Sequence, residues 1–346
     1  MQKSSSFRYL FLFLILSVPA IFFLSGCAIN LPGFSSKPRP LSDLSAEAVF
    51  VDREAIYNQT IALIESAQSS IYVQQSEFDD PRLMQLLVNK AHSGIEVRIL
   101  LDQWQAVNKA TLDQLKSQNV SIQFYPAQRG QVNNTKYLTI DSNKALIYGP
   151  AWTASEFHAH NIAVELYGRA ARRTAVLFAR DWEITTTNTL AVPDSADLPE
   201  DNIIVATNVG VKQQIIQEVA ASKESIWIAV PEISDSDLIQ ALLDASERLP
   251  EVCLILDGEA MSKAPNSLER LQSGNINIRY FPRHPQLGLR MAVFDDACFI
   301  MSSFNWTRNA FVTNHELSIT VPSPEASAKL GELFWQNWEI SAEYFE

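Results

Sequence analysis

The sequence predicts an α/β fold made of two duplicated units, and three observations support this prediction. Short apolar, β-branched runs typical of buried strands alternate with segments whose apolar residues have helical spacing. The same series of segments occurs twice, at an offset between 154 and 156 residues. The chain of 346 residues is 47% hydrophobic and 19% charged, so two units can each bury a core. We expect largely parallel central sheets covered by helices, with the units related by a pseudo-twofold axis.

The elements of the first unit follow in order from this pattern. A strand is predicted at 70–75 ("SIYVQQ"), followed by a helix over 81–94 that ends at a glycine suited to a C-cap. The next strand is at 97–102 ("VRILLD"), and a second helix–strand pair leads to the strand at 136–141 ("KYLTID"). The unit closes with the helix that contains "FARDWE", so each unit is predicted to be β-α-β-α-β-β-α.

The internal repeat is recognised at matched positions along both units. "VRILLD" ending at Asp102 pairs with "VCLILD" ending at Asp257, and "KYLTID" ending at Asp141 pairs with "RMAVFD" ending at Asp295. The closing helices match as well, "FARDWE" with "FWQNWE". A register kept at so many points indicates duplication rather than a chance succession of strands and helices.

Composition divides the chain into five segments. Residues 1–26 are predicted to be a lipoprotein signal peptide, and the Pro- and Ser-rich residues 27–45 a lipidated tether. Residues 46–184 form the first unit, 185–201 ("TTTNTLAVPDSADLPED") a linker, and 202–346 the second unit.

The N-terminal segment predicts where the protein resides. Lys3 and Arg8 precede an apolar run from Tyr9 to Leu24, which is shorter than the roughly 20 residues of a membrane span and is interrupted by Pro19. The following "LSGC" resembles the bacterial lipobox, in which the cysteine is lipidated after cleavage. We therefore expect a membrane anchor at Cys27, in the bacterial cell envelope outside the cytoplasm. The outer membrane facing the periplasm and the outer face of the plasma membrane both remain open.

Charge and composition limit the classes of partner. The net charge of −12 and the pI near 5.0 argue against broad binding to nucleic acid, which needs a basic face, but allow a local basic pocket. The spacing of histidine, cysteine and acidic residues indicates no metal site, and no cofactor is expected. Cys253 and Cys298 lie in apolar runs, and the sequence leaves both a disulfide and free buried thiols open. A protein partner cannot be named.

The strands that end at Asp141 and Asp295 carry a family resemblance. The second is followed by "DACFIMSSFNWTRNAFVTNHEL". These segments resemble the phospholipase D superfamily, which duplicates an α/β unit carrying H-x-K-x4-D and then a strand with G-S-x-N. The resemblance covers roughly residues 47 to 340. It implies a metal-free phosphodiesterase in which one histidine attacks phosphorus and the other protonates the leaving oxygen. The lysines and the G-S-x-N groups would hold the phosphate oxygens.

In the first unit the resemblance places Lys136 and Asp141 at the lysine and aspartate of the motif, but Asn134 stands at the histidine. Pro150 replaces the serine of G-S-x-N, and the region 161–163 lacks the later acidic residue of the family.

In the second unit Arg290 stands at the lysine, Asp295 at the aspartate and Gly288 at the histidine. Ser303 and Asn305 match G-S-x-N, and the later acidic residue is Glu316.

The loss of both histidines predicts a pseudoenzyme, because neither an amide nor a glycine can attack phosphorus or transfer a proton near neutral pH. We expect Lys136, Arg290, Ser303 and Asn305 to bind phosphate, with a phospholipid head group as the leading ligand, and Asp141, Asp295 and Glu316 to support them. One alternative is an envelope scaffold in which the aspartates pair with Lys136 and Arg290. Another is an active phosphodiesterase that uses a substitute nucleophile such as His284.

Overall fold

The computed structural model describes residues 39–283 and 286–343. Those residues belong to one compact unit that begins at Arg39. The signal peptide, Cys27 and His284 lie outside the described residues, so the predictions made for them remain predictions.

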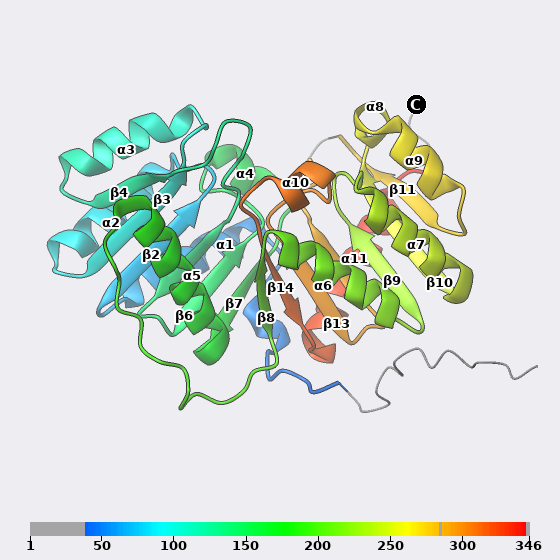
Figure 1. Ribbon diagram of the computed structural model, residues 1–346, viewed down its shortest axis with the longest axis horizontal. Helices are drawn as coiled ribbons and strands as arrows, with labels where there is room; N and C mark the ends of the chain where they lie inside the picture. The colour runs from blue at the N-terminus through cyan, green and yellow to red at the C-terminus, as the bar shows by residue number, and fades with distance from the viewer. Residues whose placement is uncertain (1–38, 284–285, 344–346) are drawn as a thin grey trace, which may run out of the picture. The chain divides into compact units, whose positions relative to one another are not determined.

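The first half of the fold is drawn from blue to green in Figure 1. Its elements are η1 (Ala46–Ala48), β1 (Val49–Phe50), α1 (Arg53–Ser66), β2 (Ser70–Gln75), α2 (Pro81–His92), β3 (Glu96–Asp102), α3 (Val107–Ser117), β4 (Ser121–Tyr125), β5 (Tyr137–Ile140), β6 (Lys144–Tyr148), α4 (Ala154–His158), β7 (Ala163–Tyr167) and α5 (Gly168–Thr186).

The second half repeats this order from green to red. Its elements are β8 (Ile204–Thr207), α6 (Val209–Ala221), β9 (Ser225–Ala229), α7 (Ser236–Arg248), β10 (Glu251–Asp257), α8 (Ala260–Lys263), α9 (Pro265–Gln272), β11 (Asn277–Phe281), β12 (Met291–Phe294), β13 (Cys298–Ser302), α10 (Arg308–Val312), β14 (Leu317–Val321) and α11 (Pro324–Ile340).

Each half contains a seven-stranded sheet, in the orders β1-β7-β6-β5-β2-β3-β4 and β11-β10-β9-β12-β13-β14-β8. The predicted α/β class with two duplicated units is therefore confirmed. The expectation of a largely parallel sheet is wrong: β2–β3 and β3–β4 are parallel, whereas the other neighbouring pairs of the first sheet are antiparallel. For β5 and β6 the reason is local, because residues 141–143 that join them are too few for a parallel crossover.

The hairpin between β5 and β6 shows how the sequence sets this local geometry. Asp141 and Ser142 both have positive φ, at 51° and 54°, and the N–H of Asn143 donates to the carbonyl of Ile140. A two-residue hairpin turn needs left-handed backbone at both central residues, and Asp tolerates it better than most side chains. Asp295 and Asp296 repeat the turn in the second half, at 53° and 51°.

Several helices begin at a capping side chain. Asp80 accepts a hydrogen bond from the N–H of Leu83 and is followed by Pro81 at the first position of α2. Ser323 caps α11 in the same way, again with a proline next in the chain. The described residues include no helix that is both long and apolar enough to cross a membrane.

Three buried clusters form the core. One lies between the first sheet and α1, α2 and α3, and a second between the second sheet and α6, α7 and α9. The third contains side chains of both sheets together with α5 and α11, for example Tyr137 and Phe178 with Met291 and Phe334. The two halves therefore share one continuous apolar layer. Cys253 and Cys298 are buried and free within the halves.

The linker between the halves is held against α5 by arginines. Arg172 donates to the carbonyls of Pro193 and Asp194, and Arg173 pairs with Asp201 at 2.9 Å. Figure 1 shows this segment as the long green loop between α5 and β8. The arginines on this face of α5 thus fasten the chain, although the protein as a whole is acidic.

Candidate functional site

The site forms where loops of the two halves contact each other. In each half, the loop that carries the histidine position of the motif contacts the loop that precedes the last strand of the other half. The N–H of Asn134 donates to the carbonyl of His315 at 2.9 Å, and the N–H of Gly288 donates to the carbonyl of His160 at 2.9 Å. The two contacts are equivalent under the internal repeat. We call the first, with Asn134, His315 and Glu316, the Asn134 crossing. The second, with Gly288, His160 and Asn161, is the Gly288 crossing.

Lys136 enters the site just before β5 and is only 4% exposed. Its Nζ donates to Oδ1 of Asn134 at 2.8 Å and to the carbonyl of Ser303 at 2.7 Å. Burial, and then the charge of Arg290, lower the pKa of Lys136 to about 8. The structure thus brings the two predicted cations close enough to repel each other.

Arg290 holds the equivalent position before β12 and is less covered. Its Nη1 donates to the carbonyl of Gly288 at 2.8 Å, and its Nε donates to Oδ1 of Asn305 at 3.2 Å. Within the described residues, Nη2 of Arg290 and Nδ2 of Asn305 have no hydrogen-bond partner. Burial lowers the pKa of the Arg290 guanidinium, while the charges of Glu156 and Glu316 act in the opposite direction.

Glu316 is fully buried at the Asn134 crossing. It accepts hydrogen bonds from Nδ2 of Asn314 at 2.9 Å and from Oγ of Ser303 at 3.3 Å, and the Asn134 side chain also bonds to it. Burial raises the pKa of Glu316 to about 8, although these hydrogen bonds and the charge of Lys136 lower it. Ser303 is therefore turned toward Glu316, and its backbone carbonyl rather than its hydroxyl contacts Lys136.

The Gly288 crossing has lost the equivalent acid and the space for a histidine. Asn161 stands in the place of Glu316, and a Cβ added at Gly288 would lie 2.3 Å from Nδ2 of Asn161. A Cβ added at Gly149 would lie 2.6 Å from its Oδ1. Because atoms cannot approach so closely, the Asn161 amide fills the volume that a side chain at 288 would need.

Asp141 and Asp295 do not pair with the cations, so the ion pairs of the scaffold alternative are not formed. Asp141 accepts from the backbone N–H groups of Gln68, Ser69 and Ser70, and Asp295 accepts from the three equivalent N–H groups. The physical reason is that Lys136 and Asp141 flank β5. At about 3.4 Å per residue, their Cα atoms lie roughly 17 Å apart.

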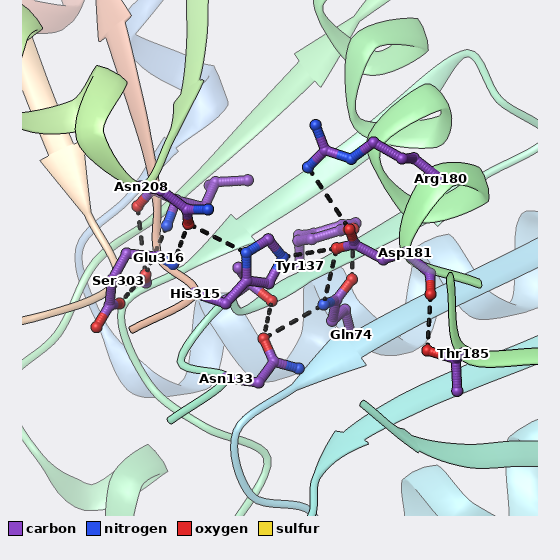
Figure 2. Close-up of polar contacts among 12 residues, drawn as sticks. Gln74, Asn133, Tyr137, Arg180, Asp181, Thr185, Asn208, Ser303, His315 and Glu316 are labelled. Atoms are coloured by element: carbon purple, nitrogen blue, oxygen red, sulfur yellow. Dashed lines mark hydrogen bonds and ion pairs between the residues drawn. The ribbon is translucent and has the colours of Figure 1, made fainter. Parts of the chain in front are cut away.

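A buried network that the sequence did not reveal supports the Asn134 crossing (Figure 2). His315 lies between Asp181 of α5, with Nε2 at 2.6 Å from Oδ2, and Asn208, with Nδ1 at 3.1 Å from Oδ1. Asn208 Oδ1 also accepts from the N–H of Glu316, so it faces His315 as an acceptor. Both ring nitrogens of His315 are therefore engaged, one by Asp181 and the other by Asn208.

The network continues into the first sheet. Nε2 of Gln74 donates to Oδ2 of Asp181 at 3.2 Å, and the hydroxyl of Tyr137 donates to Oε1 of Gln74 at 2.7 Å. Figure 2 shows the chain of contacts from Tyr137 through Gln74 and Asp181 to His315. The sequence gives only a small indication of this network. Asp181 in "FARDWE" stands where the repeat has Asn337 in "FWQNWE".

Two carboxylates that sequence reasoning missed lie near the cations. Glu77 follows β2 and Glu156 belongs to α4. Burial, and then the charge of Glu156, raise the pKa of Glu77. Glu156 also acts on Lys136 and Arg290 through its charge. In the described part of the chain, no group of three or more His, Cys, Asp or Glu could hold a metal ion.

Duplicated α/β halves with crossed motif loops define a phospholipase D-like protein. The model of the family described as "Cardiolipin synthase, PLD-like domain" matches residues 60–182 and 215–338, more than half of the chain. The chain belongs to this family.

Similar proteins agree with this assignment. The chain is 22% identical over 335 residues to a cardiolipin synthase of Clostridium perfringens, covering 84% of this chain and 70% of the relative. It is 26% identical over 295 residues to a cardiolipin synthase of Geobacillus kaustophilus, covering 74% of this chain and 56% of the relative. The chain thus spans little more than half of the second relative.

Solved structures share the fold. The phosphatidylserine synthase of Haemophilus influenzae superposes with a TM-score of 0.63 at 14% identity, over 88% of this chain and 89% of that one. The polyphosphate kinase of Porphyromonas gingivalis gives 0.61 at 14% identity, over 88% of this chain and 50% of that one.

Proposed function

We propose that this protein binds the phosphodiester of a phospholipid head group without cleaving it, at a membrane surface to which a lipidated Cys27 anchors it. Membership of a family described by cardiolipin synthase supports a phospholipid ligand. The sequence pattern before Cys27 supports the anchor.

The observation that carries the binding proposal is that both cations have only neutral hydrogen-bond partners. Among the described residues, neither Lys136 nor Arg290 forms an ion pair within 4.0 Å. A buried cation without a counterion is costly, so an anion that enters the site is stabilised. Nη2 of Arg290 and Nδ2 of Asn305 offer two free donors to phosphate oxygens.

The surrounding carboxylates favour a ligand of low charge. Glu77 and Glu156 would repel a doubly charged phosphomonoester more strongly than a singly charged phosphodiester. This supports a lipid with a phosphodiester head group over a free phosphate ester.

The two crossings support the proposed absence of turnover. The nucleophile position holds Asn134, whose Oδ1 accepts from Lys136, and the other histidine position holds Gly288, whose side-chain space is filled by Asn161. His160 does not replace either of them, because its ring is half-buried and stacks on Phe281 at 5.8 Å.

Titration of the full chain with short-chain phosphatidylglycerol, followed by calorimetry, tests the binding. The Lys136→Ala, Arg290→Ala double variant should weaken binding at least tenfold, because it removes both positive charges. Lys109→Ala is the matched control, since that side chain is 78% exposed on α3. Equal affinity of the double variant and the unmodified chain would refute the proposal.

A separate assay tests the absence of catalysis. The purified chain is incubated with phosphatidylglycerol and with bis(4-nitrophenyl) phosphate, and no product is expected. Turnover that persists through purification, and that falls in the Lys136→Ala, Arg290→Ala variant, would show that the site is catalytic.

A further inference from the structure

The outer edges of the two sheets are equivalent, yet they are covered differently. β4 ends the first sheet and β11 ends the second. At β11 the chain that follows α11 returns to the edge: the N–H of Tyr280 donates to the carbonyl of Ala342 at 2.8 Å, and the N–H of Ala342 donates back at 3.0 Å. This antiparallel bridge extends the second sheet by one short segment.

At β4 the segment that follows α5 lines the groove beside the strand, through Asn188, Thr189 and Leu190, but does not pair with it. Phe124 is the equivalent of Tyr280, so its N–H and C=O also point away from the sheet. After α5 the chain turns through Thr187, whose φ is 62°, and enters the linker that the arginines hold against α5. Among the described residues no segment pairs with the outer edge of β4.

A groove lies along each edge, and equivalent residues line the two grooves. The groove at β4 has a volume of about 540 Å³ and is lined by Ile122 and Trp182, among others. The groove at β11 has a volume of about 430 Å³ and is lined by the equivalent Ile278 and Trp338. Both volumes fall in the range of roughly 300–1,000 Å³ typical of binding sites.

Each groove also has an arginine over its tryptophan. Arg279 lies 4.7 Å from the Trp338 ring and pairs with Glu343 of the returning segment at 3.6 Å. In the first groove the arginine is on the neighbouring strand, where Arg98 lies 5.6 Å from the Trp182 ring. There Arg98 contacts Glu96 at 3.0 Å, and Lys116 adds a second positive charge. The open groove therefore also has an arginine over its tryptophan, although on a different strand from the arginine that pairs with Glu343 in the covered groove.

We propose that the outer edge of β4 binds an extended peptide segment of a partner protein, with an acidic residue directly after the residue that pairs with Phe124. The segment adds an antiparallel strand to the first sheet, as Ala342 does at β11. Main-chain hydrogen bonds to Phe124 hold it, and its acidic side chain lies against Arg98 and Lys116. An acidic partner suits this groove because its described lining contains two cations and one carboxylate.

A labelled peptide with the sequence of residues 340–346 ("ISAEYFE") is the probe, and its binding to the full chain is measured by fluorescence anisotropy. Saturable binding is expected. N-methylation of the peptide alanine removes one donor and should weaken binding about tenfold, since a hydrogen bond contributes about 0.5–1.5 kcal/mol. Replacing the glutamate that directly follows the peptide alanine by glutamine should weaken binding severalfold.

Variants of the chain locate the peptide. Arg98→Gln should weaken binding severalfold, while Arg279→Gln and the exposed-surface control Lys109→Gln should leave it unchanged. Loss with Arg279→Gln but not with Arg98→Gln would place the peptide on β11 and overturn the proposal. Equal binding of the N-methylated peptide would also overturn it, as would sedimentation of the peptide-free chain as a dimer that Arg98→Gln dissociates.

Discussion

The Asn134 and Gly288 crossings occupy equivalent places in the repeat but differ in charge. The first contains Glu316, and its histidine, His315, pairs with Asp181. In the Gly288 crossing Asn161 stands in the place of Glu316. Asn337 stands in the place of Asp181 and lies beside His160.

The difference extends into the sheets beneath them. Gln74 and Tyr137 bond to each other under the Asn134 crossing, whereas the equivalent residues of the second half are the apolar Ala229 and Met291. Both histidine positions are lost, but only one crossing has also lost its ionisable partners. The Asn134 crossing is thus a buried polar site, whereas the Gly288 crossing is packed more like core.

The largest expected effect comes from breaking the ionic pair. Asp181→Ala should destabilise the protein by about 3–5 kcal/mol, because it leaves a buried histidine that has lost its carboxylate partner. Asn337→Ala at the equivalent place should cost about 1–2 kcal/mol, since it removes a neutral hydrogen bond. Urea unfolding of both variants measures the difference, and equal costs would show that the crossings do not differ in charge.

The pH dependence of stability should come from the Asn134 crossing. The pKa of Glu316 is raised from 4.5 to about 8, so between these values the folded state holds a proton that the unfolded state has released. The free energy of unfolding should therefore fall as pH rises through this window, by a few kcal/mol in total. Lys136, with a pKa lowered from 10.5 to about 8, has the opposite effect only above about pH 8.

Glu316→Gln isolates this contribution. Urea unfolding between pH 5 and 8 should show a flatter pH dependence for the variant than for the unmodified chain. Identical curves would show that Glu316 is ionised in the folded state throughout this window.

A double-mutant cycle tests the packing of the Gly288 crossing. Gly288→Ala should cost about 1–3 kcal/mol, because its Cβ meets the Asn161 amide, and Asn161→Ala should relieve most of that cost. Unfolding of the two single variants and the double variant gives the coupling energy. Additive costs would mean that the Asn161 side chain does not fill this space. Asn134→Ala is the matched control and should show no coupling to Asn161→Ala.

The smallest expected effect is at the turn aspartates. Burial would raise the pKa of Asp141, but hydrogen bonds from Ser70, Ser69 and Gln68 together lower it. Its contribution to stability is thus present above the unfolded pKa near 3.8 and lost as pH falls. Asp141→Asn and Asp295→Asn should each cost about 1 kcal/mol at pH 7, and nearly equally, since both accept from three backbone N–H groups. A much larger loss of stability for one of the two variants in thermal unfolding would show that the two turns are not equivalent.

Much of the fold could be predicted because it depends on local pattern. The strand at 70–75 and the helix that begins at Pro81 follow from apolar spacing and capping. Because the sequence repeats, the elements of the second half could be predicted from those of the first. The mixed sheet could not be predicted, because an apolar run indicates a strand but not whether the neighbouring strand is parallel or antiparallel to it. The short turn at Asp141 indicates antiparallel pairing of the two flanking strands, but in the sequence it coincides with the aspartate of the motif.

The sequence by itself determined the duplication, the missing histidines and the two cations, since each is visible as a residue at a repeated position. Only the tertiary structure decided what surrounds them. Asp181 and His315 are 134 residues apart in the chain, and Asn161 reaches Gly288 from the other half. Burial and charge at the site depend on such distant contacts. For this reason Lys136 and Arg290 have no carboxylate partner among the described residues, while the aspartates of their own motifs lie at the far ends of the strands.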